Sequence, residues 1–197
     1  MDFIPESLEL EDFKTHKKSY IDFSKFSSAV ILGTKENDDT ISNATGKTTI
    51  LHALKYVLYN EYATKTIDKV IRKGASRTVV TFIFLLDSDR YKIQRSRSKK
   101  NKSSEVLLFK QDTKGEFKAL DGVRASETDK EIQKILKINY TGFTNAVIFS
   151  QGDLSGIANT KDSKARFALI EEILNLTEYP KLEKIVKTDY IANYNKE

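Results

Sequence analysis

The stretch that most constrains the fold of this chain is residues 41–50, which read I-S-N-A-T-G-K-T-T-I. An apolar run at residues 29–33 precedes it and is predicted to form a buried strand. The segment after it, residues 47–59, places its apolar side chains at helical spacing. A strand, a polar loop, Gly-Lys-Thr and a helix form the layout of a phosphate-binding loop. The sequence therefore predicts a nucleotide site at the start of a helix.

The residue types of this loop explain the chemistry expected of it. A helix N-terminus offers backbone N–H groups and the positive end of the helix dipole, and both favour a phosphate. Lys47 can reach terminal phosphate oxygens, and the Thr48 hydroxyl can coordinate Mg²⁺. The alternative, a chance Gly-Lys-Thr, is disfavoured because both flanking elements stand where the motif requires them.

The loop departs from the usual pattern in two places. The pattern G-x-x-x-x-G-K-[ST] requires glycine at position 41, where this chain has Ile41. Gly33 lies eight residues earlier, so we expect a loop enlarged by residues 35–40. Ala44 stands where many such loops carry glycine, which restricts the backbone if that position needs a positive φ. The geometry of this loop around a nucleotide is therefore left open.

The composition limits the class of protein. A chain of 197 residues with 39% hydrophobic and 10% aromatic residues can bury a sizeable core and is typical of a globular domain. The chain has no cysteine, which excludes disulfides and thiolate metal sites and is compatible with a reducing cytoplasm. Neither a secretory signal nor an apolar run of membrane-spanning length is visible. We expect a cytoplasmic or nucleoid-associated protein.

Positive charge is concentrated in one segment. The formal net charge is +5, and residues 90–102 contain seven basic residues and no acid. Such a segment suits a polyanion, commonly nucleic acid, although a solvated hairpin is an equally open alternative. The candidate DNA contacts are Arg90, Lys92, Arg95, Arg97, Lys99 and Lys100.

Hydrophobic patterning predicts the remaining elements. Strands are expected at residues 8–13, 20–23, 79–86, 91–95 and 106–110. One helix is expected to be capped by Ser126, with Asp129 three residues on, and to have an apolar face of Ile132, Ile135 and Leu136. Another is expected over residues 163–176, with Phe167, Ile170, Ile173 and Leu174 facing inward.

Six segments share their pattern with one family. They are L-E-L-E-D-F-K-T-H at residues 8–16, S-N-A-T-G-K-T-T at 42–49, V-I-R-K-G-A at 70–75, R-Y-K-I-Q-R-S-R at 90–97, F-S-Q-G-D-L at 149–154 and R-F-A-L-I-E-E-I-L-N-L at 166–176. Together they resemble the N-terminal ATPase lobe of the SMC-like DNA-repair ATPases. The closest likeness is to the SbcC type, whose partner is an SbcD-type, Mre-eleven-like nuclease. The glutamine segment and the helix that follows it make the resemblance specific.

The resemblance implies a fold and a set of site residues. The fold is α/β, an ABC-type ATPase lobe over residues 1–176, with a mixed sheet and an antiparallel β subdomain around the phosphate-loop helix; residues 177–197 begin a coiled coil. The cofactors are ATP and Mg²⁺, with Lys47 and Gln151 in catalytic roles and Thr48 and Gln151 as metal ligands. The implied nucleotide contacts are Lys14, Asn43, Ala44, Thr45, Gly46, Lys47, Thr48 and Thr49. Lys14 stands where the family commonly has arginine. His16 lies in the same turn, although a lone histidine is more often a surface residue, and His52 is expected to pack or to be solvated.

The implied function is ATP-driven control of a DNA-processing nuclease by a homodimer of heads that sandwich ATP and close on double-stranded DNA. In this family the Walker B acidic pair, the signature helix and the switch histidine lie in a C-terminal lobe. We find no such acidic pair here, and we expect activity only with that lobe, in the same or a separate chain, and on head dimerisation. Two alternatives stay open: an SMC- or RecF-like ATPase that loads onto DNA without a nuclease, and a DNA-binding module that has lost hydrolysis.

Overall fold

A computed structural model describes residues 2–34, 45–62, 66–120, 124–147, 162–173, 176, 179 and 182–188. The chain divides into two compact units, Met1–Ile135 and Leu136–Glu197. The predicted boundary between the ATPase lobe and the coiled coil, at residue 176, remains a prediction.

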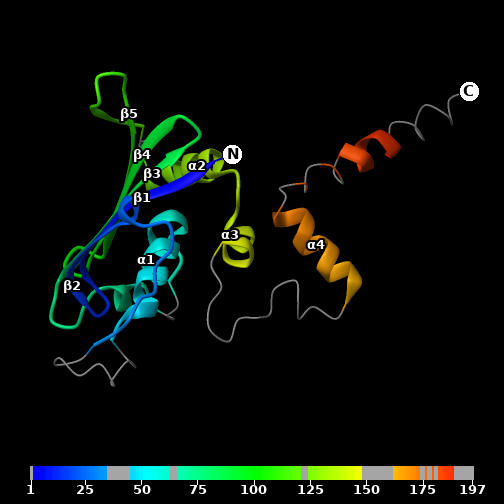
Figure 1. The fold of residues 1–197 in the computed structure, drawn as a ribbon. Helices are drawn as coiled ribbons and strands as arrows, with labels where there is room; N and C mark the ends of the chain where they lie inside the picture. The colour runs from blue at the N-terminus through cyan, green and yellow to red at the C-terminus, as the bar shows by residue number, and fades with distance from the viewer. Residues whose placement is uncertain are drawn as a thin grey trace, which may run out of the picture. The chain divides into compact units, whose positions relative to one another are not determined.

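The first unit is built on a six-stranded antiparallel sheet with the strand order β2-β1-β3-β4-β5-β6 (Figure 1). The strands are β1 (Phe3–Phe13), β2 (His16–Asp22), β3 (Arg77–Leu86), β4 (Asp89–Ser98), β5 (Ser103–Gln111) and β6 (Phe117–Ala119). All five strands predicted around this sheet are confirmed, and most are longer than their sequence patterns indicated.

Alternation along the strands gives the sheet one deeply buried face. Its core side chains include Leu8, Leu10, Phe82, Phe84, Ile93 and Leu108, each at most 1% exposed. Helix α1 (Lys47–Tyr59) packs along this face (Figure 1) and buries Ala53, Tyr56, Val57 and Leu58 against it. The bounds predicted for α1 are confirmed. Two short 3₁₀ helices, η1 (Phe23–Lys25) and η2 (Ile67–Val70), follow β2 and α1.

The strand predicted at residues 29–32 is not formed. Among the described residues no strand pairs with this segment, and Val30 and Leu32 are 84% and 80% exposed. A buried strand needs a neighbour that takes up its backbone N–H and C=O groups. The apolar run here lies outside the sheet because the described residues supply no such neighbour.

Helix α2 (Ala125–Leu136) begins one residue before Ser126, so the prediction that Ser126 caps it is wrong. The backbone N–H of Arg124 instead donates to Oε2 of Glu127 at 3.3 Å. Asp129, which the capping pattern places near the helix start, pairs with Arg95. Ile132 and Leu136 are buried, as predicted.

The second unit contains α3 (Tyr140–Ala146) and α4 (Ser163–Ile173). The side chain of Asn139 caps α3 by accepting from the N–H of Gly142 at 2.7 Å. On α4, Phe167 and Ile170 are 63% and 36% exposed, so the prediction that they face inward is wrong for the described structure. In the part of the chain that is described, no helix has both the length and the apolar character to cross a membrane.

Candidate functional site

The two ends of the phosphate loop meet at Gly33 and Thr45. A methyl group on Gly33 would overlap Oγ1 of Thr45, so no larger residue fits at this position. The close approach is what the first glycine of a phosphate loop provides, and it supports the prediction of an enlarged loop that begins at Gly33. Asn43, Ala44 and Gln151 lie outside the described residues.

Gly46 sets the start of α1. Its φ of 90° and ψ of 8° lie in the left-handed region, and its carbonyl accepts from the N–H of Thr49 at 2.9 Å. Glycine supplies no side-chain cap, and the positive end of a helix dipole favours an anion. Lys47 and Thr48 occupy the first turn, where Thr48 is exposed and Thr49 is buried.

The turn between β1 and β2 packs directly on this helix start. Oγ1 of Thr15 lies 3.3 Å from Oγ1 of Thr49, and Nε2 of His16 donates to the carbonyl of Gly46 at 3.1 Å. Because a carbonyl only accepts, Nε2 carries the proton and Nδ1 of His16 accepts from the Ser19 hydroxyl at 2.7 Å. A Cβ on Gly46 would come within 2.6 Å of Thr15 Oγ1 and 2.9 Å of His16 Nε2. The turn therefore fits only against glycine.

Lys14, in the same turn, contacts α1 through a histidine. Its Nζ lies 2.8 Å from Nδ1 of His52, and both side chains are half-buried. Burial lowers the pKa of Lys14. Burial also lowers the pKa of His52, and the positive charges of Lys14 and Lys55 lower it further. His52 is thus neutral at pH 7, as an acceptor from an ammonium group must be.

Lys14 also lines a positively charged cleft of about 630 Å³, which we call the lysine cleft. Its lining residues are Lys14, Thr66, Asp68, Lys69, Ile71, Lys73 and Lys99. Except for Lys14 and Lys99, sequence reasoning assigned none of these a role. They come from three separate segments, so only the fold brings them together.

Arg90 and Lys92 alternate along β4 with the buried Tyr91 and Ile93, so they lie on the face of the sheet opposite α1. Nε of Arg90 donates to Oε2 of Glu6 at 2.5 Å. Nζ of Lys92 lies 4.2 Å from the ring centroid of Phe109 and 4.6 Å from that of Phe117. Both cations therefore already have partners on the sheet surface.

Arg95 and Arg97 point to the other side of β4. Arg95 is 2% exposed, and it donates to the carbonyl of Val57 at 3.2 Å and to Oδ1 of Asp129 at 2.5 Å. The side chain of Arg97 is 11% exposed and donates to Oδ1 of Asp68 at 2.8 Å. These burials correct the prediction that Arg95 and Arg97 contact DNA. Lys99 and Lys100, in the following turn, are exposed as that prediction requires.

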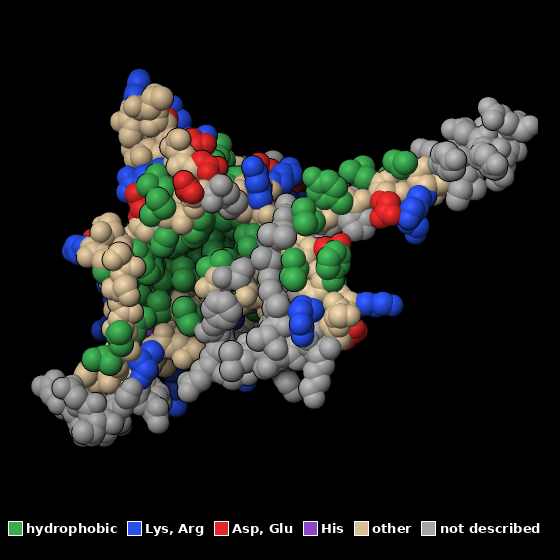
Figure 2. Space-filling view, turned by 45° about the vertical axis from the view of Figure 1, so that its right-hand side comes forward, with side chains coloured by type: hydrophobic (Ala, Val, Ile, Leu, Met, Phe, Trp, Pro, Cys, Tyr) green, Lys and Arg blue, Asp and Glu red, His purple; other side chains and the backbone are tan. Residues whose placement is uncertain are grey.

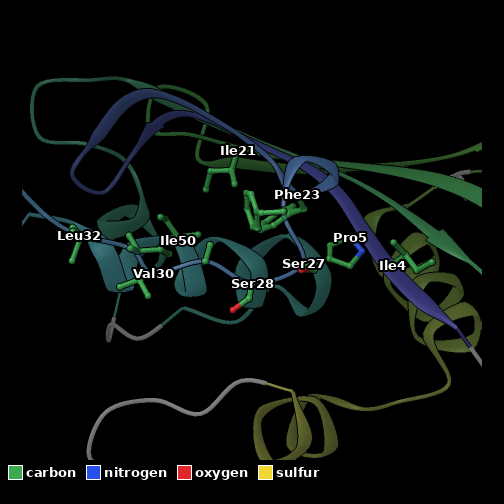
Figure 3. Close-up of a pocket in the computed structure, with 12 residues that line it drawn as sticks. Ile4, Pro5, Ile21, Phe23, Ser27, Ser28, Val30, Leu32 and Ile50 are labelled. Atoms are coloured by element: carbon green, nitrogen blue, oxygen red, sulfur yellow. The ribbon is translucent and has the colours of Figure 1, made fainter.

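An apolar pocket of about 710 Å³ lies on the α1 side of the sheet edge formed by β1 and β2. Figure 3 shows Ile21 and Phe23 on its sheet side, with Val30 and Ile50 opposite them. In the space-filling view, hydrophobic side chains gather in a hollow of the visible face (Figure 2). The exposed residues 29–32 border this pocket, so an apolar surface continues from the sheet to the unpaired segment.

Comparison with known proteins identifies the family. An AAA domain model matches residues 7–197. The chain belongs to this AAA domain family. It is 25% identical over 191 residues to the DNA double-strand break repair Rad50 ATPase of Methanococcus maripaludis, which covers 95% of this chain and 17% of that protein. It is 25% identical over 134 residues to the SbcC component of the nuclease SbcCD of Deinococcus radiodurans, covering 66% of this chain and 15% of that protein.

These relatives confirm the resemblance to the SMC-like, SbcC-type ATPases, and the chain spans less than a fifth of their length. Among solved structures, the recombination mediator protein RecF with ATP is 19% identical, with a TM-score of 0.48. That match covers 91% of this chain and 43% of the RecF chain.

Proposed function

We propose that this chain is the N-terminal lobe of an ATP-hydrolysing DNA-repair head of the SbcC type. The observation that carries the proposal is the start of α1, where a left-handed Gly46 is clasped by Thr15 and His16. The phosphates of ATP bind at this helix start, and Lys47 reaches their terminal oxygens.

The first turn of α1 also has the group that a magnesium site needs. Thr48 is exposed, so its hydroxyl can serve as a metal ligand beside phosphate oxygens and water. Among the described residues, no cluster of three or more acidic or histidine side chains competes for a metal ion. Thr48 would hold Mg²⁺, with Gln151 as the predicted second ligand, and the ion would neutralise charge on the phosphates.

The lysine cleft extends this site. Lys14 belongs both to the turn on α1 and to the lining of the cleft, so the two sites adjoin at its side chain. We place the adenosine part of the nucleotide in the lysine cleft, because this cleft shares Lys14 with the turn that packs on the start of α1, where the triphosphate binds. Thr66 and Asp68 offer polar groups for a ribose, and Ile71 offers an apolar contact for a base.

A C-terminal lobe, in the same or a separate chain, completes the head. Residues 29–32 expose an apolar run beside the apolar pocket, which is the surface that a further strand and its side chains would cover. That lobe brings the acidic pair and signature segment, so hydrolysis requires it and the dimerisation of two heads. Its partner is an SbcD-type nuclease, and double-stranded DNA meets the exposed lysines after β4.

Calorimetry with ATP and Mg²⁺ tests the nucleotide site. Lys47→Ala is expected to weaken ATP binding at least about 100-fold, because a charge-assisted contact to phosphate is lost. Lys55→Ala, which removes a lysine from the same helix two turns on, is the matched control and should bind as the unmodified chain does. Equal affinity of the Lys47 variant, with an unchanged circular dichroism spectrum, would overturn the proposal.

A further inference from the structure

His52 lies on α1 one turn beyond Thr48, and sequence reasoning gave it no role. Its Nδ1 is 2.8 Å from Nζ of Lys14, on a turn that is 38 positions away in the sequence. An ammonium group only donates hydrogen bonds, so Nδ1 is the acceptor and the ring proton sits on Nε2. The contact thus fixes both the tautomer of His52 and the position of the Lys14 ammonium.

The backbone of Lys14 is already anchored. Its φ of 49° is left-handed, and its N–H donates to the carbonyl of Val70 at 2.8 Å. Beside it, the N–H of Arg72 donates to the carbonyl of Asp12 at 2.7 Å, and Nε of Arg72 to Oδ1 of Asp12 at 2.6 Å. The freedom that remains is in the long side chain, and ordering such a side chain on binding reduces affinity.

The surroundings of Lys14 supply no competing carboxylate contact. In the described part of the chain no ion pair joins Lys14 to an acid, and Asp68 in the lysine cleft pairs with Arg97. Lys69, Lys73 and Lys99 line the same cleft, and as hydrogen-bond donors they offer the ammonium no acceptor. His52 is therefore the group that holds it.

We propose that His52 is a positioning residue for nucleotide binding, which holds the Lys14 ammonium between the start of α1 and the lysine cleft. The inference rests on the proposed nucleotide site. A neutral imidazole suits this task, because it orients the ammonium without cancelling the positive charge that meets a phosphate. A carboxylate at position 52 would hold Lys14 as firmly but would offset that charge. His52 thus acts on the nucleotide only through Lys14.

A double-mutant cycle on ATP affinity separates this role from a general structural one. We expect Lys14→Ala to weaken ATP binding about tenfold, because one charged contact to the nucleotide is lost. We expect His52→Ala to weaken it about fivefold, because the Lys14 side chain must then be ordered on binding. The double variant should bind like Lys14→Ala alone, whereas Lys55→Ala should match the unmodified chain. His52→Gln, which keeps an acceptor, should retain most of the affinity.

Two results would overturn the inference: full affinity in His52→Ala, or a His52→Ala loss that persists undiminished in the Lys14→Ala background. If the unmodified chain does not bind ATP at all, the proposed nucleotide site itself is wrong.

Nitrogen-15 NMR without nucleotide tests the contact separately. The chain has only two histidines, so both rings can be assigned. Lys14→Ala should shift the Nδ1 resonance of His52 and leave that of His16 in place, since His16 is held by Gly46 and Ser19. An unmoved His52 resonance would contradict the proposed hold on Lys14.

Discussion

At the scale of single residues, the site depends on one glycine that meets two demands. Gly46 has a φ of 90°, which disfavours any side chain, and it packs against Thr15 and His16. Gly74 has a nearly identical φ of 89°, but among the described residues no atom beyond its chain neighbours would lie within 4 Å of a methyl group there. Substitution by alanine therefore costs only backbone strain at Gly74, whereas at Gly46 it costs backbone strain and a steric clash.

We expect Gly46→Ala to weaken ATP binding at least about tenfold and to destabilise the fold by about 2 kcal/mol, since the new methyl must displace the turn that carries Lys14. Gly74→Ala should destabilise by about 1 kcal/mol through backbone strain alone and leave ATP affinity unchanged. Urea unfolding and calorimetry on both variants measure the difference. Equal losses of affinity in the two would show that contact at Gly46 is unimportant.

Residue-scale chemistry was only partly visible in the sequence. The motif predicted Gly46, Lys47 and Thr48 as site residues because the roles proposed for them follow from local spacing. The pairing of Lys14 with His52 joins residues 38 positions apart, and no local pattern indicates it. The burial of Arg95 was missed because the basic segment was interpreted as a charged surface, although strand alternation places Arg95 on the same face as the buried Tyr91 and Ile93.

At the scale of elements, sequence periodicity was most reliable where an element satisfies its own backbone or pairs with a near neighbour. The limits of α1 and the presence of strands β3 and β4 were predicted on this basis. Residues 29–32 have the composition of a strand, yet a strand forms only beside a partner, and the described residues provide none. Phe167 and Ile170 on α4 likewise have the spacing of an apolar helix face, but both are exposed, and the described residues provide no surface that covers them.

Arg95 connects three elements, because from β4 it reaches Val57 at the end of α1 and Asp129 on α2. We expect Arg95→Ala to destabilise the first unit by about 3 kcal/mol, since it leaves a cavity and an unpaired Asp129. The matched control is Arg77→Ala, which breaks the exposed ion pair with Glu105 and should cost less than about 0.5 kcal/mol. Urea denaturation followed by circular dichroism measures both, and similar values for the two variants would contradict a linking role for Arg95.

The turn after β4 is where we expect DNA contact, because Lys99 and Lys100 are exposed whereas Arg95 and Arg97 are not. Lys100→Glu, which lies outside the lysine cleft, should lower affinity for duplex DNA, independently of sequence, and reduce the salt slope by about one. Lys114→Glu, in the exposed turn after β5, makes the same change of net charge and should have little effect. Fluorescence anisotropy over a range of salt concentrations is the measurement. Equal slopes for both variants would place the DNA site elsewhere.

At the scale of the whole molecule, our proposal makes the chain one part of a composite enzyme. The phosphate-loop side of the site is built from β1, β2 and α1, while residues 29–32 and the adjoining apolar pocket leave an apolar surface uncovered by the described residues. The family resemblance implied a second lobe that carries the acidic pair, and the exposed apolar run at residues 29–32 is consistent with that proposal.

Steady-state ATP turnover tests this central claim most directly. The chain is measured alone, and then with the C-terminal lobe added, at saturating ATP and Mg²⁺. We predict negligible turnover by the chain alone. Once the lobe is supplied, we predict Mg²⁺-dependent hydrolysis, and the Lys47→Ala variant should lack it. Robust turnover by the chain alone, abolished by Gln151→Ala, would show that the catalytic set is already complete within these residues and would contradict the account.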